Sequence, residues 1–139
     1  MDHGATLRRL YDAINAGDID AFDSVMADDF VEHEETPGLA PTREGVKAFF
    51  RMYIAAFPDL HFDAQDVLVS GDKAIGRVMV TGTHQGEFIG IPATGKKVSV
   101  QAIDIVRFDS DGLGREHWGL FDLTALMQQL GVVPEGTPA

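Results

Sequence analysis

The stretch GIPATGKKVSVQAIDIVRF, residues 90–108, decides the fold of this chain. Its first half, GIPATGKK, lies one letter from the phosphate-binding pattern G-x-x-x-x-G-K-[ST], whose backbone N–H groups hold phosphates at the start of a helix. Lys97 stands where the pattern requires a hydroxyl for magnesium, and the VSVQAIDIVRF that follows is β-branched and apolar, which is typical of a strand. We therefore predict no nucleotide site here, and we interpret residues 82–97 as a long connection between two strands.

Strand patterns lie on both sides of this connection. Apolar and β-branched runs separated by the turn signals SGD and DSDGLG predict strands over His61 to Val69, Lys73 to Thr83, Val98 to Phe108 and Arg115 to Phe121. A shorter strand, Phe30 to His33, is predicted upstream of them.

Apolar residues at helical spacing predict helices at both ends of the chain. The first carries Leu7, Leu10, Tyr11 and Ile14 on one face; a short second carries Phe22, Val25 and Met26; a third, capped by Thr42, carries Phe50 and Tyr53 and ends at Pro58. Residues 123–130 make a closing helix, with Gly131 at its C-cap.

Helices followed by an antiparallel sheet predict an α+β fold with the helices on one face of the sheet. A strongly curved sheet wrapped around the long third helix would leave a conical pocket. Phe88, Ile89 and Ile91 of the long connection would then cover its mouth. We expect a single domain over residues 1–139, with a frayed tail over about 132–139.

The composition excludes several classes of function. A net charge of −11, with Lys and Arg scattered, argues against binding to nucleic acid or to an anionic membrane. The absence of cysteine excludes disulfides, thiolate catalysis and cysteine-bound metals. No stretch approaches the length of a membrane span, and the first residues lack the apolar core of a signal peptide, so we expect a cytoplasmic protein.

Asp104 is the first candidate for chemistry, because it lies inside the apolar run AIDIVRF. A carboxylate buried without a partner would be costly, so it must be paired or hydrogen-bonded. Arg107 lies an odd number of positions away and points to the opposite face of the strand, which leaves Arg77 on the neighbouring strand as the expected partner. A structural ion pair and a functional group of the pocket are equally compatible with this position.

Asp122 is the second candidate, between the last strand and the closing helix. A hairpin turned at residues 109–114 pairs positions that sum to about 224, which places Asp104, Trp118 and Leu120 on one face, together with Asp122. Asp is also a preferred N-cap, so capping and catalysis both remain open for this residue.

The histidines give weaker signals. His33 ends the first strand at the expected pocket mouth, where either a functional or a plain surface role fits. The run HEE lacks the i, i+4 spacing of helical metal ligands, so we expect no metal. His84 and His117 are interpreted as surface or rim residues, and Tyr11 as a core residue whose hydroxyl needs a partner.

Taken together, these stretches resemble the SnoaL-like polyketide cyclases of the nuclear-transport-factor-2-like superfamily. The resemblance rests mainly on GTHQGEFIGIPATGKKV and IDIVRFDSDGLGREHWGLFDLTALMQQLG, and it runs over nearly the whole chain. It implies a cone-shaped α+β fold, a homodimer formed through the outer sheet face, and an apolar cavity. It also implies ring closure of a polyketide ester by intramolecular aldol condensation without metal or cofactor. Asp122 matches the family's acid/base by position, whereas Gln101 and Asp104 stand where a polar companion, a histidine, would be expected.

A second resemblance is to the ketosteroid isomerases of the same superfamily. In these, a tyrosine and an aspartic acid form the oxyanion hole, and Tyr11 and Asp104 match them; the base position falls at His33 or Glu34. The long loop before Val98 is not isomerase-like and favours the cyclases.

The sequence thus predicts cofactor-free acid/base catalysis on a mostly apolar carbonyl compound. We expect Asp122 to act with help from Asp104 and His33, and a homodimer to form through Ile103 and Ile105. The substrate would contact Tyr11, Phe50, Tyr53, Trp118 and Leu120. The alternatives are a non-catalytic binding or accessory domain, and an isomerase or epoxide-opening enzyme.

Overall fold

The computed structural model of the protein describes residues 2–132. Its elements are α1 (His3–Ala16), the 3₁₀ helix η1 (Ile19–Ser24), β1 (Met26–Glu32), α2 (Arg43–Ala56), β2 (His61–Ser70), β3 (Lys73–Thr83), β4 (Lys97–Phe108), β5 (Gly114–Phe121) and α3 (Leu123–Leu130). The tail predicted to fray lies, from residue 133 on, outside the described residues. Within residues 2–132, none of the helices could span a lipid bilayer.

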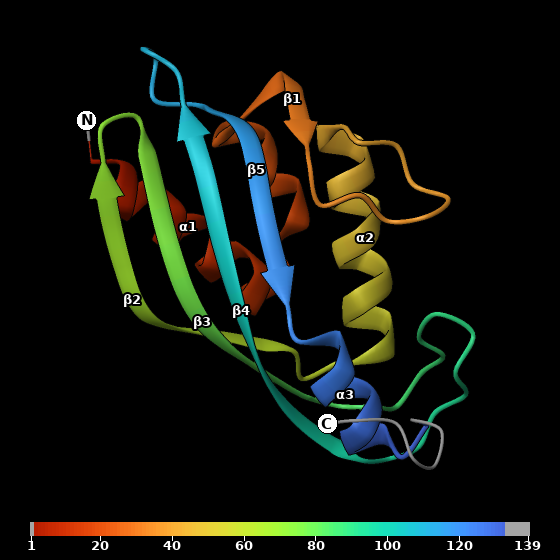
Figure 1. Ribbon diagram of the computed structural model, residues 1–139. Coiled ribbons are helices and arrows are strands. Elements are labelled where there is room, and N and C mark those ends of the chain that lie inside the picture. The colour runs from red at the N-terminus through yellow and green to blue at the C-terminus, as the bar shows by residue number, and fades with distance from the viewer. Residues whose placement is uncertain (1, 133–139) are drawn as a thin grey trace.

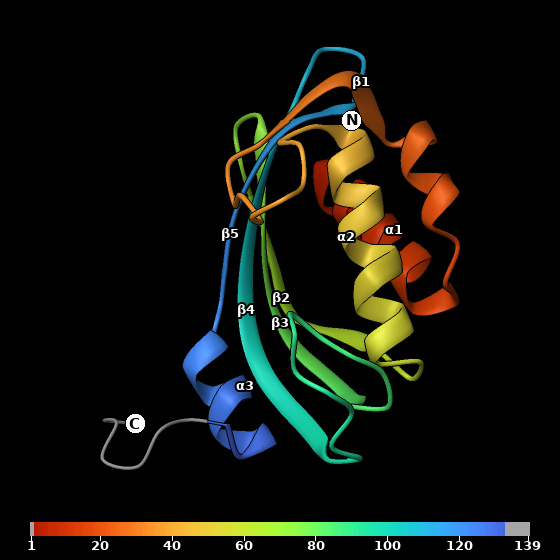
Figure 2. The ribbon, with the colours of Figure 1, turned by 90° about the vertical axis from the view of Figure 1, so that its right-hand side faces the viewer.

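The strands form one curved sheet in the order β1-β5-β4-β3-β2 (Figure 1). Figure 2 shows α1, η1 and α2 together on its concave side, as the sequence predicts for an α+β fold. The sheet is mixed and not purely antiparallel, because β1 pairs parallel to β5. The chain enters β1 from η1 at the same end of the sheet where β5 begins, so the two strands run side by side in one direction.

The strand β1 begins earlier than predicted. Val25 and Met26 were expected on the short helix, but η1 ends at Ser24 and Met26 opens the strand. Both side chains are still buried, Val25 at the end of η1 and Met26 at the start of the strand. The apolar pattern predicted burial correctly and the local conformation wrongly.

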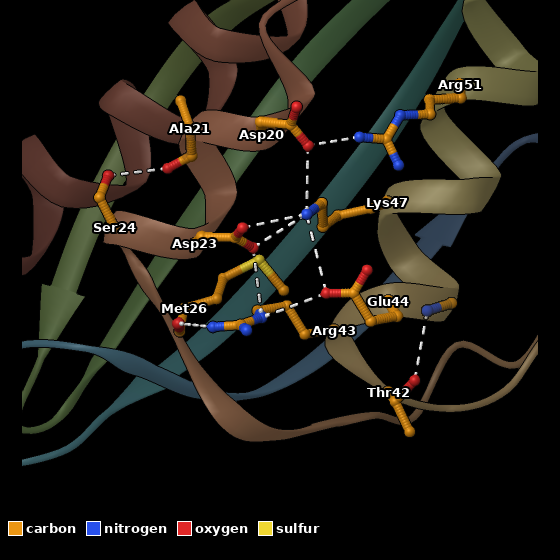
Figure 3. A network of polar contacts seen from close by, with 11 residues as sticks. Asp20, Ala21, Asp23, Ser24, Met26, Thr42, Arg43, Glu44, Lys47 and Arg51 are labelled. Atoms are coloured by element: carbon orange, nitrogen blue, oxygen red, sulfur yellow. Dashed lines mark hydrogen bonds and ion pairs between the residues drawn. The ribbon is translucent and has the colours of Figure 1, made fainter.

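An ion-pair network holds α2 against η1 (Figure 3). Lys47 is 5% exposed. Its ammonium group donates to both carboxylate oxygens of Asp23 at 3.0 and 3.1 Å and contacts Asp20 at 3.2 Å. Arg51 pairs with Asp20 one turn further along α2. The network fixes the position of the helix that covers the sheet.

The helix α3 continues where β5 stops and covers the free edge of β4. The Gln129 side-chain amide accepts from the Ser99 backbone N–H at 2.7 Å and donates to the Ser99 carbonyl at 2.9 Å. These bonds satisfy edge groups that would otherwise be open to pairing with another strand.

The connection between β3 and β4 is a long loop followed by a strand, as predicted. Phe88 is not at a pocket mouth, since it is 2% exposed and packs on Tyr53 and Phe57. Ile89 is half exposed, with a φ of 45°. None of residues 84–96 lines the cavity between the sheet and the helices α1 and α2, so this loop does not cover its mouth.

Candidate active site

A cavity of about 200 Å³ lies between the concave face of the sheet and the helices α1 and α2. Its walls are mainly aromatic and aliphatic, with Tyr11, Phe22, Phe50, Tyr53 and Phe62 among the lining residues. The lining residues that are exposed, Glu35, Ala40, Pro41 and Leu120, place the mouth between the loop 33–42 and the end of β5.

Polar side chains gather on the sheet wall of this cavity. Asp104 of β4 accepts from the Tyr11 hydroxyl at 2.9 Å through Oδ2, and its Oδ1 lies 2.8 Å from Nε2 of His117. The other ring nitrogen of His117, Nδ1, lies 2.6 Å from Oε1 of Glu32. One imidazole therefore bridges two carboxylates, and all three side chains are 16% exposed or less.

The surroundings keep His117 charged. Burial alone would lower its pKa, but the hydrogen bonds and charges of Asp104 and Glu32 outweigh burial and raise the pKa to about 10. Both ring nitrogens then carry hydrogens and donate, one to each carboxylate.

Glu34 contributes a further carboxyl group to the cavity wall. Burial raises its pKa; the His117 charge opposes this and the Asp104 and Glu32 carboxylates reinforce it, so that the pKa lies at about 7. Its backbone N–H donates to Glu32 at 2.8 Å, which holds the residue beside the cluster. Among the described residues, no hydrogen bond to its side-chain oxygens is found.

Tyr53 brings a hydroxyl group from α2 to the same cavity. The residue is 5% exposed, and burial, followed by the Glu34 charge, raises its pKa well above the ordinary value. Within residues 2–132 its hydroxyl has no hydrogen-bond partner, so it is free to donate to a ligand.

Three of these residues also have the donor types that a metal ion requires. Ligand atoms of Glu32, Glu34 and His117 all lie within 4.8 Å of one another. Both nitrogens of His117 are already hydrogen-bonded, so an ion would have to displace a proton and one of those bonds. The prediction that no metal is needed stays a prediction.

The structure brings together four of the eight predicted site residues. Asp104, Tyr11, Phe50 and Tyr53 line the cavity, whereas Leu120 is 80% exposed and reaches only its mouth.

The other three lie elsewhere. Asp122 is exposed, caps α3 through the Ala125 N–H at 2.9 Å, and is not a lining residue. His33 lies 2.8 Å from Glu116 and stacks on Trp118, away from the cavity.

The predicted register of the last hairpin was wrong by one residue. Asp104 pairs with Gly119, and Trp118 pairs with Ile105, so the Trp118 side chain lies on the outer face. The register shifts next to the turn, where Arg107 pairs with Glu116 but Phe108 pairs with Gly114. This bulge inserts Arg115 without a partner and exchanges the two faces of β5.

The same geometry corrects the expected partner of Asp104. Arg77 lies on the outer face and pairs with Asp66, at 2.8 Å from Nε and 2.6 Å from a terminal nitrogen. The partners of Asp104 are Tyr11 and His117. His117 was interpreted as a surface or rim residue, but its side chain is only 16% exposed and lies in the wall of the cavity. In the register that includes the bulge, His117 pairs with the buried Val106, and this pairing would have predicted that His117 faces the cavity.

Comparison with known proteins gives a consistent result. The model of the SnoaL-like polyketide cyclase family matches residues 5–130. The aklanonic acid methyl ester cyclases DauD of Streptomyces sp. (strain C5) and DnrD of Streptomyces peucetius are each 26% identical over 136 residues. The match covers 94% of this chain and 84% and 93% of theirs. Among solved structures, TsrD from Streptomyces laurentii is 33% identical with a TM-score of 0.83, and the match covers 93% of this chain and 97% of that one.

Proposed function

The chain belongs to the SnoaL-like polyketide cyclase family, and from this premise we propose that it closes a ring in a mostly apolar carbonyl compound by acid/base catalysis. The observation that carries the proposal is the asymmetry of the cavity. Its walls are mainly apolar, and on the sheet side Glu34, Asp104 and His117 gather with the Tyr11 hydroxyl, while Tyr53 faces Glu34 from α2. Perturbed ionisable groups in an apolar cavity are typical of sites for proton transfer.

Among the carboxylates of the wall, Glu34 is best suited to move a proton. Both oxygens of Asp104 accept hydrogen bonds, and Glu32 accepts from His117 and from the Glu34 N–H, so these two groups hold the site together. Glu34 has free oxygens and a pKa of about 7, which is close to the optimum for a general base near neutral pH. Asp122 and His33, the acid/base groups expected from the sequence, stay a prediction, and the proposal assigns the proton transfer to Glu34.

The reaction balances without a co-reactant. Glu34 takes a proton from the carbon next to a carbonyl group, and the Tyr53 hydroxyl donates to the oxygen of the enolate that forms. The enolate carbon bonds to a second carbonyl carbon of the same molecule. The resulting alkoxide takes a proton from Glu34-H, so the product is an isomer of the substrate and the carboxylate is restored.

The first test is proton exchange, with 2-tetralone as a small apolar ketone. In D₂O the wild type should speed exchange of its α-hydrogens, with a rate that rises with pH and levels off above about 7 as Glu34 ionises. Glu34→Gln should lower the acceleration of exchange by a factor of about 10²–10⁴. Glu87→Gln, the same change at an exposed position that does not line the cavity, is the control. Exchange by the wild type no faster than in buffer, for 2-tetralone and a panel of related ketones and esters, would favour a binding domain.

A double-bond isomerisation would begin with the same proton removal. The Tyr11–Asp104 hydrogen bond at 2.9 Å favours this second candidate, because the two groups match the oxyanion-binding pair of the ketosteroid isomerases. Product analysis separates the two: an isomerase moves a double bond in an unsaturated ketone, and a cyclase forms a new carbon–carbon bond.

We also propose a homodimer through the outer face of the sheet. Leu68, Ile75, Ile105 and Trp118 are direct cross-strand neighbours and form one apolar row across four strands. Ile103 and Leu120 extend the row, at 48% and 80% exposure. A contiguous exposed apolar surface of this kind favours association.

A further inference from the structure

Two glycines flank Asp104 in the middle of the sheet. Gly76 of β3 and Gly119 of β5 are its direct cross-strand partners. Glycine weakens the interior of a strand, because it packs no side chain and loses more backbone freedom on folding. Neither residue is among the glycines with a positive φ, so backbone conformation does not require them. Their positions call for another physical reason.

That reason is space on the cavity side of β5. A Cβ at Gly119 would overlap Oε1 of Glu34, and it would lie 2.6 Å from Cε1 and 2.9 Å from Nε2 of His117. Contacts this short force a displacement. The volume that a side chain would take at this position is filled by the Glu34 carboxylate and by the edge of the imidazole ring.

Gly76 plays the same part on the other side of Asp104. A Cβ there would overlap the Tyr11 hydroxyl oxygen, and it would lie 3.0 Å from Cζ and 3.1 Å from Cε2 of that ring. The missing side chain lets the hydroxyl reach Asp104 and donate to it at 2.9 Å.

We propose that Gly76 and Gly119 are positioning residues of the active centre, which let Tyr11 and Glu34 converge on either side of Asp104. The catalytic consequence rests on the proposed function, whereas the placement of the two side chains does not. Any larger residue at position 119 pushes the Glu34 carboxylate off the wall and leaves the cavity without its free proton acceptor. Position 119 therefore decides whether this fold carries that group.

The groups that face Glu34 make its displacement measurable. Glu32 from β1, Asp104 from β4 and His117 from β5 act on it, and Tyr53 faces it from α2. Moving the carboxylate out removes the burial and the two like charges that raise its pKa, while the opposing His117 charge is lost as well. The midpoint should therefore fall from about 7 toward the ordinary 4.5.

The experiment is a ¹³C carboxyl titration of Gly119→Ala, Gly76→Ala and Gly82→Ala, with Glu34→Gln to assign the resonance. Gly82→Ala is the matched control, because it lies on the same strand as Gly76 and the three atoms nearest to its Cβ, at 3.1–3.4 Å, all belong to the apolar side chain of Phe57. Gly119→Ala should lower the Glu34 midpoint by at least one pH unit, and Gly82→Ala should leave it unchanged. An unchanged midpoint in Gly119→Ala overturns the proposal.

The two tyrosines of the chain allow a separate test of Gly76 by 3-fluorotyrosine labelling. Gly76→Ala should shift the Tyr11 ¹⁹F resonance more than Gly82→Ala does, and equal shifts would contradict its role. If Gly119→Ala is unstable, its loss of stability is measured again in a Glu34→Ala background. A smaller loss there supports the steric conflict, and an equal loss, unfolding in both included, overturns it. Failure of ketone exchange in the wild type would refute the proposed function and leave these results standing.

Discussion

Replacing Glu34 by Gln should change how the stability of the protein depends on pH. The pKa of Glu34 lies at about 7 in the folded chain and at 4.5 as the reference for the unfolded chain. The folded state therefore binds the proton more tightly. The contribution of this proton binding to the free energy of unfolding is fully present below pH 4.5 and is lost as the pH rises through 7. The wild type should lose stability over this pH interval. In Glu34→Gln the side chain cannot ionise, so the loss that comes from position 34 should be absent.

The size of the effect follows from the shift. A difference of about 2.5 pH units corresponds to roughly 3.4 kcal/mol as an upper bound. Glu34 is only partly buried, so solvent screening reduces this to about 1–2 kcal/mol. His117 also loses stabilisation as the pH rises from 6.5 through about 10, but it is present in both proteins and largely cancels in their difference.

Urea unfolding of the two proteins at pH 4.5, 6, 7 and 8 measures this difference directly. The free energy of unfolding of the wild type should fall relative to that of Glu34→Gln by about 1–2 kcal/mol between the first and last pH. Glu35→Gln should follow the wild type, because its side chain lies on the exposed part of the loop. Parallel curves for the wild type and Glu34→Gln would refute the placement of Glu34 in the cavity wall.

Four further outcomes are expected. Asp122→Asn should change the free energy of unfolding by only a few tenths of a kcal/mol, because Asn caps a helix as well as Asp does. The rate of ketone exchange should stay within about twofold of the wild type. A loss of about 10²–10⁴ in that rate would return the catalytic role to Asp122. Lys47→Met should lower the urea midpoint more than Arg51→Met does, because Lys47 is the buried centre of the α2–η1 network; an equal effect would contradict that role. The wild type is expected to sediment as the proposed dimer and Ile105→Glu as a monomer; a monomeric wild type would refute the dimer, and an unchanged dimer in the variant would rule out this face. ATP with magnesium at millimolar concentration should leave the amide spectrum of residues 90–97 unmoved, whereas saturable shifts would restore the nucleotide site.

The architecture was predictable because local signals agree with one another. The strands predicted at His61 to Val69 and Lys73 to Thr83 match β2 and β3 to within one residue. A glycine-containing turn separates them, and apolar residues alternate along β3. The apolar stripe of α1 is buried as predicted, and its tyrosine hydroxyl found the partner that burial requires. The strands, the turn and the apolar stripe depend on residues that are close in the sequence, whereas the partner of the Tyr11 hydroxyl, Asp104, lies 93 positions away.

The site was less predictable because it depends on pairing between distant residues. The alternation along β4 correctly turned Asp104 inward, and nothing in that strand told which residues of β5 face it. Glu34 follows the short strand β1, whose parallel pairing with β5 was not foreseen. Its approach to His117 depends on a missing side chain at Gly119, and an isolated glycine in a strand pattern has several explanations.

A single extra residue in β5 decides whether His117 or Trp118 faces the cavity. The pair Phe108–Gly114 at the turn would, if continued without a bulge, set Asp104 opposite Trp118 and turn the indole ring into the cavity. Arg115 takes up one extra position, and it is held by ion pairs to Asp29 at 2.7 Å and Asp109 at 3.3 Å. Every residue of β5 beyond it therefore changes face. The bulge brings His117 and Gly119 to the cavity wall and sends Trp118 to the outer face, where it joins the row proposed to form the dimer. The chemistry of the cavity and the apolar character of the outer face thus follow from the same local irregularity.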